Sequence, residues 1–136
     1  MRALGIDFGS KRIGVALSDS GGLLATPYEL IKRVGDRTVE HGRIAELVEE
    51  TGAEVVVVGL PLQLDGDEGR AVALVRSEIR GLRKRLEVPV EEIDERFTTV
   101  TAHQQLASAG VVSRKRKDLV DAVAASVLLQ AWLDRR

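Results

Sequence analysis

The 136-residue sequence contains no cysteine, two histidines and few aromatic residues: two phenylalanines, one tyrosine and one tryptophan. Without cysteine, the chain has no disulfide, no thiolate nucleophile and no cysteine-ligated zinc or iron–sulfur site. His41 and His103 cannot form a three-histidine metal site, so any metal would depend on oxygen ligands, which favours magnesium or manganese. Because few aromatic rings are available for base stacking, a bound nucleic acid would be held mainly by its phosphates.

The sequence also lacks a long apolar run and a large net charge. No stretch approaches the roughly 18 apolar residues of a membrane span, and Asp7 interrupts the N-terminus too early for a signal peptide. We therefore expect a cytoplasmic protein without membrane contact. With a net charge of −1, the chain as a whole lacks the excess of positive charge that would attract nucleic acid. A composition of 44% hydrophobic and 30% charged residues over this length predicts one globular domain, residues 1–136.

Three strands are predicted at the start of the chain. Leu4, Ile6 and Phe8 alternate with glycine and aspartate, and a second alternating segment follows over residues 13–18. Gly21-Gly22 marks a hairpin turn into a third strand over residues 23–30. Pro27 favours an edge position for this strand, because proline cannot donate to the ladder. We therefore expect an antiparallel meander.

Strands and helices alternate in the rest of the chain. We expect helices from Asp36, as N-cap, to Gly52, and over residues 68–86, 98–110 and 118–133. The β-branched run at residues 55–58 is typical of a central parallel strand buried on both faces, and residues 90–94 form a fifth strand. The prediction is an α/β fold with a mixed five-stranded sheet, an antiparallel meander then two parallel strands, and helices on both faces.

Acidic residues that could bind a metal lie at three places. Asp7 sits between Gly5 and Gly9 on a strand face with small side chains, although an Asp-Phe-Gly sequence here could equally just end the strand. Asp94 and Glu95 close the fifth strand, at the carboxyl edge where α/β sheets place their sites. Because side chains alternate, one of these two should face the site, and the sequence leaves open which.

The third place is the start of the last helix. Asp118 is interpreted as its N-cap. Asp121 lies among apolar residues, where an isolated buried carboxylate would cost several kcal/mol unless paired or metal-bound. Small residues at positions 122, 124 and 125 would let this helix approach Gly5, Gly14 and Ala16, which would bring Asp121 close to Asp7. Such a cluster of acids can hold Mg²⁺ or Mn²⁺ for phosphodiester hydrolysis.

Four motifs resemble those of the YqgF/RuvX family, in the family's order and over essentially the whole chain. They are residues 7–14 (DFGSKRIG), 58–61 (VGLP) with Asp65-Gly66, 94–99 (DERFTT) and 120–125 (VDAVAA). Each is weak alone, but together they are specific. Residues 7–14 also resemble the phosphate-binding hairpin of actin-like ATPases, although 136 residues provide one such lobe and no second half to grip adenosine.

The family resemblance implies a ribonuclease H-like fold, related to the Holliday-junction resolvase RuvC. It also implies a nuclease role in 5′-end maturation of pre-16S ribosomal RNA, with junction resolution as an older assignment. The family's acids carry over to Asp7, the Asp94–Glu95 pair and Asp121. We expect Asp7, Glu95 and Asp121 as metal ligands, with Asp94 as a further ligand or orienting group.

Basic residues near these acids would hold phosphates, and we expect them to contact nucleic acid. They are Lys11 and Arg12, after the first strand, and a loop formed by Arg114, Lys115, Arg116 and Lys117. Two alternatives to RNA hydrolysis remain: a junction-resolving DNA endonuclease, which would act on branched DNA as a homodimer, and an RNA-binding ribosome-assembly factor that does not cut.

Overall fold

The computed structural model describes residues 1–61, 69–94 and 113–136, with the backbone alone described for 113–120. The strands are β1 (Ala3–Phe8), β2 (Arg12–Ser18), β3 (Ala25–Lys32), β4 (Val55–Leu60) and β5 (Val90–Asp94). The helices are α1 (Arg37–Thr51), α2 (Arg70–Arg85) and α4 (Ser113–Asp134). In this part of the chain, no helix is long and apolar enough to cross a membrane.

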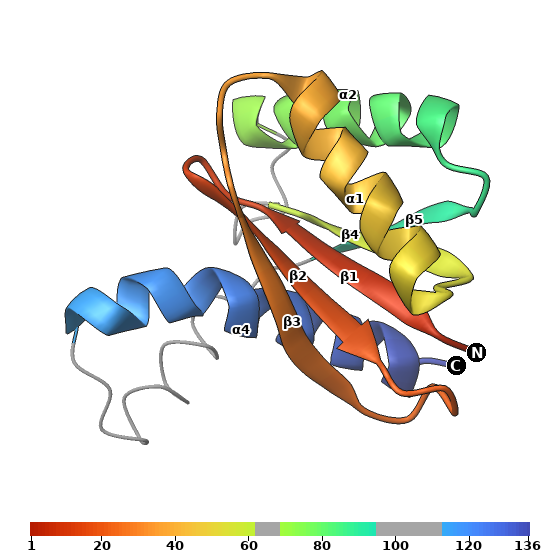
Figure 1. Ribbon diagram of the computed structural model, residues 1–136. Coiled ribbons are helices and arrows are strands. Elements are labelled where there is room, and N and C mark those ends of the chain that lie inside the picture. Colours follow the sequence, from red (N-terminus) through yellow and green to blue (C-terminus); the bar gives the residue numbers. More distant parts are fainter. Residues whose placement is uncertain (62–68, 95–112) are drawn as a thin grey trace.

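The five strands form one sheet in the order β3-β2-β1-β4-β5. β1, β2 and β3 pair antiparallel, whereas β4 is parallel to both β1 and β5. Helices α1 and α2 lie on one face of this sheet and α4 crosses the other (Figure 1). The predicted mixed sheet, with its meander, its two parallel strands and its helices on both faces, is confirmed.

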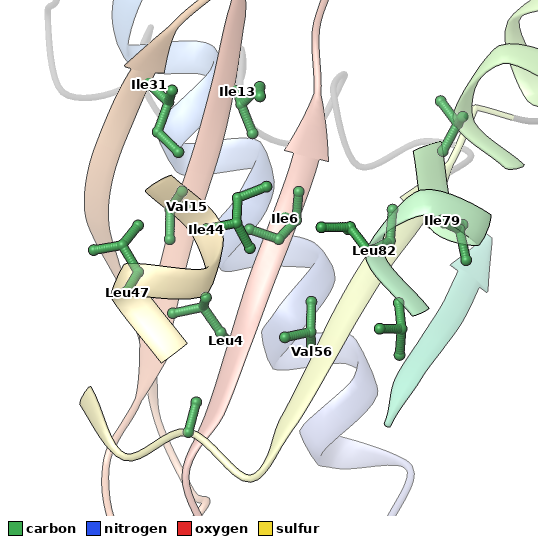
Figure 2. Packing of buried hydrophobic residues seen from close by; sticks show 14 of the residues in the cluster. Leu4, Ile6, Ile13, Val15, Ile31, Ile44, Leu47, Val56, Ile79 and Leu82 are labelled. Carbon is green, nitrogen blue, oxygen red and sulfur yellow. The ribbon is translucent and has the colours of Figure 1, made fainter. Parts of the chain in front are cut away.

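Two hydrophobic cores lie on opposite faces of the sheet because side chains alternate along each strand. Leu4, Ile6 and Val56 pack beneath α1 and α2, together with Ile44 and Leu82 from those helices (Figure 2). The second core lies beneath α4, where the sheet and the helix contribute Ala3, Ala16, Val55, Val57, Ile93, Ala125, Leu128 and Leu129. The run at 55–58 therefore supplies both cores, as predicted for a central strand.

The ends of α1 follow the predicted capping rules. The Asp36 side chain accepts a hydrogen bond from Thr38 N at 2.9 Å, which satisfies one free N–H of the first turn. Gly52 has the left-handed φ of 71°, and its N–H donates to Val48 O, so a glycine closes the helix.

Several predicted boundaries differ from the structure. β3 begins at Ala25 rather than residue 23, because the Asp19 carboxylate accepts hydrogen bonds from Leu23 N and Leu24 N and holds these residues in the loop. α2 begins at Arg70 rather than residue 68, and residue 68 itself lies outside the described residues. The helix predicted over residues 98–110 also lies outside them.

The start of α4 is the largest correction. The helix begins at Ser113, five residues before the predicted start. Asp118 therefore lies within the helix and is not its N-cap, and the run Arg114–Lys117 is part of the helix rather than a loop. Lysine and arginine are good helix formers, so a basic run continues a helix as readily as it forms a surface loop.

Candidate active site

Asp7 lies near the end of β1, on the face covered by α4. Ala3 belongs to the core beneath α4, and alternation along β1 places Gly5 and Asp7 on the same face. Asp7 is directly opposite Gly14 of β2 in the antiparallel register. Its exposed fraction is 9%, so this carboxylate is nearly removed from solvent, where an ionised group needs compensating partners.

The glycines around Asp7 let α4 rest directly on the strands. A Cβ at Gly5 would lie 2.8 Å from Leu129 Cβ, and a Cβ at Gly14 would collide with the carbonyl oxygen of Asp121. The backbone of α4 therefore occupies the space that side chains would fill at these positions. The predicted approach of this helix to the small face of β1 and β2 is present in the structure.

This approach brings Asp121 to the corner that holds Asp7. Gly14 is both the register partner of Asp7 and the residue against the Asp121 backbone. The Asp121 carboxylate reaches the β1–β2 hairpin: its Oδ2 accepts a hydrogen bond from Arg12 Nε at 3.3 Å. Its Oδ1 would lie 3.5 Å from a Cβ at Gly9. Two acids 114 residues apart by number thus meet beside a glycine-rich turn.

Asp94 lies on the other face of the sheet. Within β5, Val90 belongs to the core beneath α1 and α2, whereas Ile93 belongs to the core beneath α4. Alternation therefore puts Asp94 on the same face as Val90, opposite Asp7. Its backbone ends β5 beside Leu60 of β4. Glu95 lies outside the described residues.

The predicted phosphate-binding residues are partly described. Lys11 is exposed in the β1–β2 hairpin, and Arg12 is half-buried against Asp121. The hairpin is closed by Gly9 N donating to Arg12 O at 2.9 Å. For Arg114, Lys115, Arg116 and Lys117 the structure gives the helical backbone, which leads along α4 toward Asp121.

Comparison with known proteins is decisive for the family. The model of RuvX, described as Holliday junction resolvase, matches residues 1–135. The chain belongs to the RuvX family. Its relatives include a protein of Rhodococcus opacus, 45% identical over 139 residues that cover 99% of this chain and 78% of the relative. Another, from Maridesulfovibrio salexigens, is 37% identical with 99% of both chains covered. Both are named "Putative pre-16S rRNA nuclease".

The fold of this RuvX-family chain is also that of RuvC. The structure of Thermus thermophilus RuvC in complex with Holliday junction substrate matches with a TM-score of 0.60 and 19% identity, and covers 99% of this chain and 95% of that one. At that identity the likeness concerns the fold alone. The ribonuclease H-like fold expected from the motifs is thereby shown.

The donor set of the RuvX-family site fits a hard divalent cation. Asp7 and Asp121 supply carboxylate oxygens at a partly buried corner, which Mg²⁺ and Mn²⁺ prefer over nitrogen or sulfur ligands. The glycine at position 9 leaves the Asp121 Oδ1 side of the corner without a side chain. Among the described residues no group of three histidine or acidic side chains is arranged to hold a metal ion; the third predicted ligand, Glu95, is not among them.

Sequence reasoning missed a buried ionic cluster behind the hairpin, which we call the Arg33 cluster: Arg33, Glu40, His41 and Glu78. Arg33 Nη1 donates to Glu40 Oε1 at 2.9 Å, and Nη2 donates to Glu78 Oε2 at 2.6 Å. His41 Nε2 lies 2.9 Å from Glu78 Oε1. Glu40, His41 and Glu78 are each at most 5% exposed.

The Arg33 cluster is bonded to the hairpin of the active site. Arg33 Nε donates to Gly9 O at 3.0 Å, and the Arg33 N–H donates to Lys11 O at 3.0 Å. The guanidinium carbon also lies 5.1 Å from the centroid of the Phe8 ring. The available signal was two glutamates and a histidine on otherwise apolar inward faces of α1 and α2, which calls for a buried cation.

The electrostatics of this cluster favour the charged form of Glu78. Burial acts to raise the pKa of Glu78, but hydrogen bonds from His41 and Arg33, with the positive charges of Arg33 and Arg37, outweigh it and hold this pKa below its ordinary value. The pKa of Arg33 is raised: burial opposes its charge, but the bonds to Glu78 and Glu40 dominate. Glu78 and Arg33 are thus both held in their charged forms behind the hairpin.

Proposed function

We propose that this protein is a metal-dependent nuclease that hydrolyses phosphodiesters in structured RNA, in 5′-end processing of pre-16S ribosomal RNA. The observation that carries the proposal is the meeting of Asp7 and Asp121 at a glycine-lined corner, in a chain that belongs to the RuvX family. Precursor ribosomal RNA as substrate is supported by the names of the relatives. The proposal takes residues 1–136 as one cytoplasmic nuclease domain.

Asp7, Glu95 and Asp121 would hold Mg²⁺ or Mn²⁺, which supplies water activation and stabilisation of the leaving oxygen. Asp94 is proposed as an orienting group rather than a direct ligand, since it lies on the face opposite Asp7. Arg12 already bonds Asp121, so its guanidinium is placed to hold a phosphate beside the acids. Lys11 on the same hairpin, and Arg114 to Lys117 on α4, would contact flanking phosphates.

The test is a cleavage assay with a labelled precursor ribosomal RNA and a four-way DNA junction, in magnesium, manganese or EDTA. Asp7→Asn and Asp121→Asn remove one proposed ligand charge each, and Asp134→Asn at the far end of α4 is the matched control. Removing a residue that only orients a metal ligand lowers metal affinity or activity about 10–100-fold. We therefore expect the cleavage rate to fall by more than about 100-fold in the two ligand variants. Cutting that survives both substitutions would contradict the site.

Junction resolution is the second candidate function, because the family model is described as Holliday junction resolvase. It requires two symmetric cuts and therefore a homodimer with two sites. Cleavage of the DNA junction in place of the RNA, by a species that sedimentation shows to be dimeric, would select this function. Binding of RNA without cutting in every metal condition would instead select the ribosome-assembly role.

A further inference from the structure

The β1–β2 hairpin also forms one wall of an open cleft of about 1090 Å³. The N-terminal half of α2, with Ala71, Leu74 and Val75, and residues of the segment from Leu30 to Arg37 also line this cleft. Its volume lies just above the range for small-ligand pockets, about 300–1,000 Å³. An open space of this size suits an extended chain better than one small ligand.

The cleft is positively charged although the chain as a whole carries −1. Five cations line it, namely Lys11, Arg12, Lys32, Arg33 and Arg37, against two carboxylates, Glu40 and Glu78. Both carboxylates already accept hydrogen bonds from Arg33. Glu40 also accepts hydrogen bonds from the backbone N–H groups of Val34 and Gly35 through its Oε2. Arg12 is paired with Asp121, and Arg33 and Arg37 are paired with these carboxylates, so the positive charge left over in the cleft is that of the two lysines.

Lys11 and Lys32 are the cations best placed to use that charge. Both are exposed, and within the described ranges neither forms an ion pair. They lie close together, because Lys32 is the register partner of Arg12 and the Arg33 N–H bonds Lys11 O. Two flexible ammonium groups on neighbouring backbone segments can both reach the phosphates of one strand.

The rest of the cleft offers surfaces for bases. Arg37 is held at the rim by a hydrogen bond from Nη1 to Ser77 Oγ at 2.9 Å, while 48% of its side chain stays exposed. A fixed guanidinium plane is a platform on which bases stack. Leu74 and Leu30 also line the cleft and are 55% and 37% exposed, so they add apolar area to it. Leu74 belongs to neither hydrophobic core.

The cleft is continuous with the candidate active site through the hairpin. Gly9 lines the cleft, and the same residue borders the Asp121 carboxylate. We propose that this cleft binds single-stranded RNA flanking the cleaved phosphodiester, with backbone phosphates at Lys11 and Lys32 and a base against Arg37 and Leu74. This inference rests on the proposed nuclease function, and it adds a path for the substrate behind the hairpin.

The first test measures binding of labelled single-stranded RNA in EDTA, so that cleavage plays no part. Lys32→Gln removes one positive charge inside the cleft. Lys84→Gln removes the same charge outside it, at the exposed far end of α2. Each phosphate contact contributes about 0.7 to the slope of log affinity against log salt for single strands. We expect Lys32→Gln to lower the slope by about this amount, and Lys84→Gln to leave it unchanged. Arg37→Gln should weaken binding about fivefold or more.

The second test uses the absence of cysteine from the chain. Leu74→Cys and Leu23→Cys each give one attachment site for a fluorophore or a photo-crosslinker, the first in the cleft and the second in the exposed β2–β3 loop. We expect single-stranded RNA to quench or cross-link the label at position 74 and not the label at position 23. A mononucleotide should leave both labels unchanged at the same nucleotide concentration.

The outcomes separate this inference from the proposed function. Equal effects of Lys32→Gln and Lys84→Gln, or labelling that does not distinguish position 74 from position 23, would overturn the cleft while leaving the nuclease intact. A mononucleotide that binds as well as the RNA strand would also overturn it, in favour of a nucleotide pocket. Binding in the cleft as expected, with no cleavage of the RNA or the DNA junction in any metal condition, would instead overturn the nuclease alone.

Discussion

At the scale of single residues, the active-site corner depends on missing side chains as much as on acids. Gly14 faces the backbone of α4 where any Cβ would collide with the Asp121 carbonyl oxygen, and a Cβ at Gly5 would lie 2.8 Å from Leu129 Cβ. The helix can carry Asp121 to the hairpin because these two positions have no Cβ. The approach of Asp121 to the strand that carries Asp7 thus depends on two glycines.

Gly14→Ala should therefore damage both stability and site. The added methyl must push α4 away from β2, and overpacking of this kind costs about 1–3 kcal/mol. Gly21→Ala is the control, since the nearest atom to its Cβ would be Asp19 Oδ2 at 4.0 Å, and a change of about 0.5 kcal/mol or less is expected. Urea unfolding measures the difference. Equal midpoints for the two variants would mean that α4 does not rest on Gly14.

The candidate metal-binding carboxylates could be predicted only in part from the sequence. The pattern around Asp7 and the isolated acid at Asp121 were visible in the sequence, and the structure brings these two together. The choice between Asp94 and Glu95 was open, because alternation within a strand assigns faces but the sequence does not say which face holds the site. Packing shows only the face of Asp94, which lies on the side of α1 and α2 because Ile93 belongs to the core beneath α4; Glu95 lies outside the described residues.

At the scale of elements, the Arg33 cluster ties three segments to one hairpin. Arg33 follows β3, Glu40 belongs to α1 and Glu78 to α2, and Arg33 also bonds Gly9 O at the turn beside the active site. One guanidinium therefore sets where two helices stand relative to the turn after Asp7. A planar fork with five N–H donors can do this, whereas a lysine ammonium cannot.

Arg33→Met should be strongly destabilising because it leaves Glu40 and Glu78 buried without their cation. Breaking a buried ion pair from one side costs about 3–5 kcal/mol. Arg43→Met is the matched control: Arg43 pairs with Glu29 and Glu50 at the surface, where such pairs contribute about 1 kcal/mol or less. Thermal and urea unfolding provide the comparison, and similar losses in both variants would show that the cluster adds nothing beyond a surface pair.

The start of α4 shows where the N-cap rule gave a wrong helix boundary. The prediction started α4 at Asp118 because aspartate is a strong N-cap, yet the helix begins at Ser113 and includes the basic run. A capping residue within a helix is tolerated when the residues before it are good helix formers. The shift matters for function, since it places the backbone of Arg114 to Lys117 on the helix that carries Asp121.

At the scale of the whole molecule, the pH dependence of stability should report on the Arg33 cluster. The pKa of Glu78 is lower in the folded protein than its ordinary value of 4.5, because the bonds and charges of His41, Arg33 and Arg37 outweigh the opposing effect of burial. A carboxyl with a lowered folded pKa contributes stability that is present above about pH 4.5 and is lost as the pH falls through the folded value.

Glu78→Gln should therefore be less stable than the parent at pH 7 and should lose less further stability on acidification. Glu49→Gln, on the exposed side of α1, should keep the full acid loss of the parent. Urea unfolding between pH 7 and pH 3 gives the free energy of unfolding for each variant. An acid loss as steep in Glu78→Gln as in Glu49→Gln would contradict the assignment of this pH dependence to the cluster.

Local pattern by itself determined much of this protein. The mixed sheet was predictable from the alternation in β1 and β2 and from the valine run of β4, and the bounds of α1 from its caps. Each of these follows from short-range backbone and side-chain preferences. Four motifs in order indicated the family, and Asp7 and Asp121 stood out as acids in apolar or glycine-rich surroundings.

The tertiary structure alone decided what depends on contacts across the sheet. The face of Asp94, the ionic cluster of Arg33, Glu40, His41 and Glu78, and the basic cleft all join segments up to tens of residues apart, and each lies where strand register and helix docking place it. Local preferences say nothing about such pairings, because a buried charge is recognisable in sequence as needing a partner but its partner is chosen only by packing.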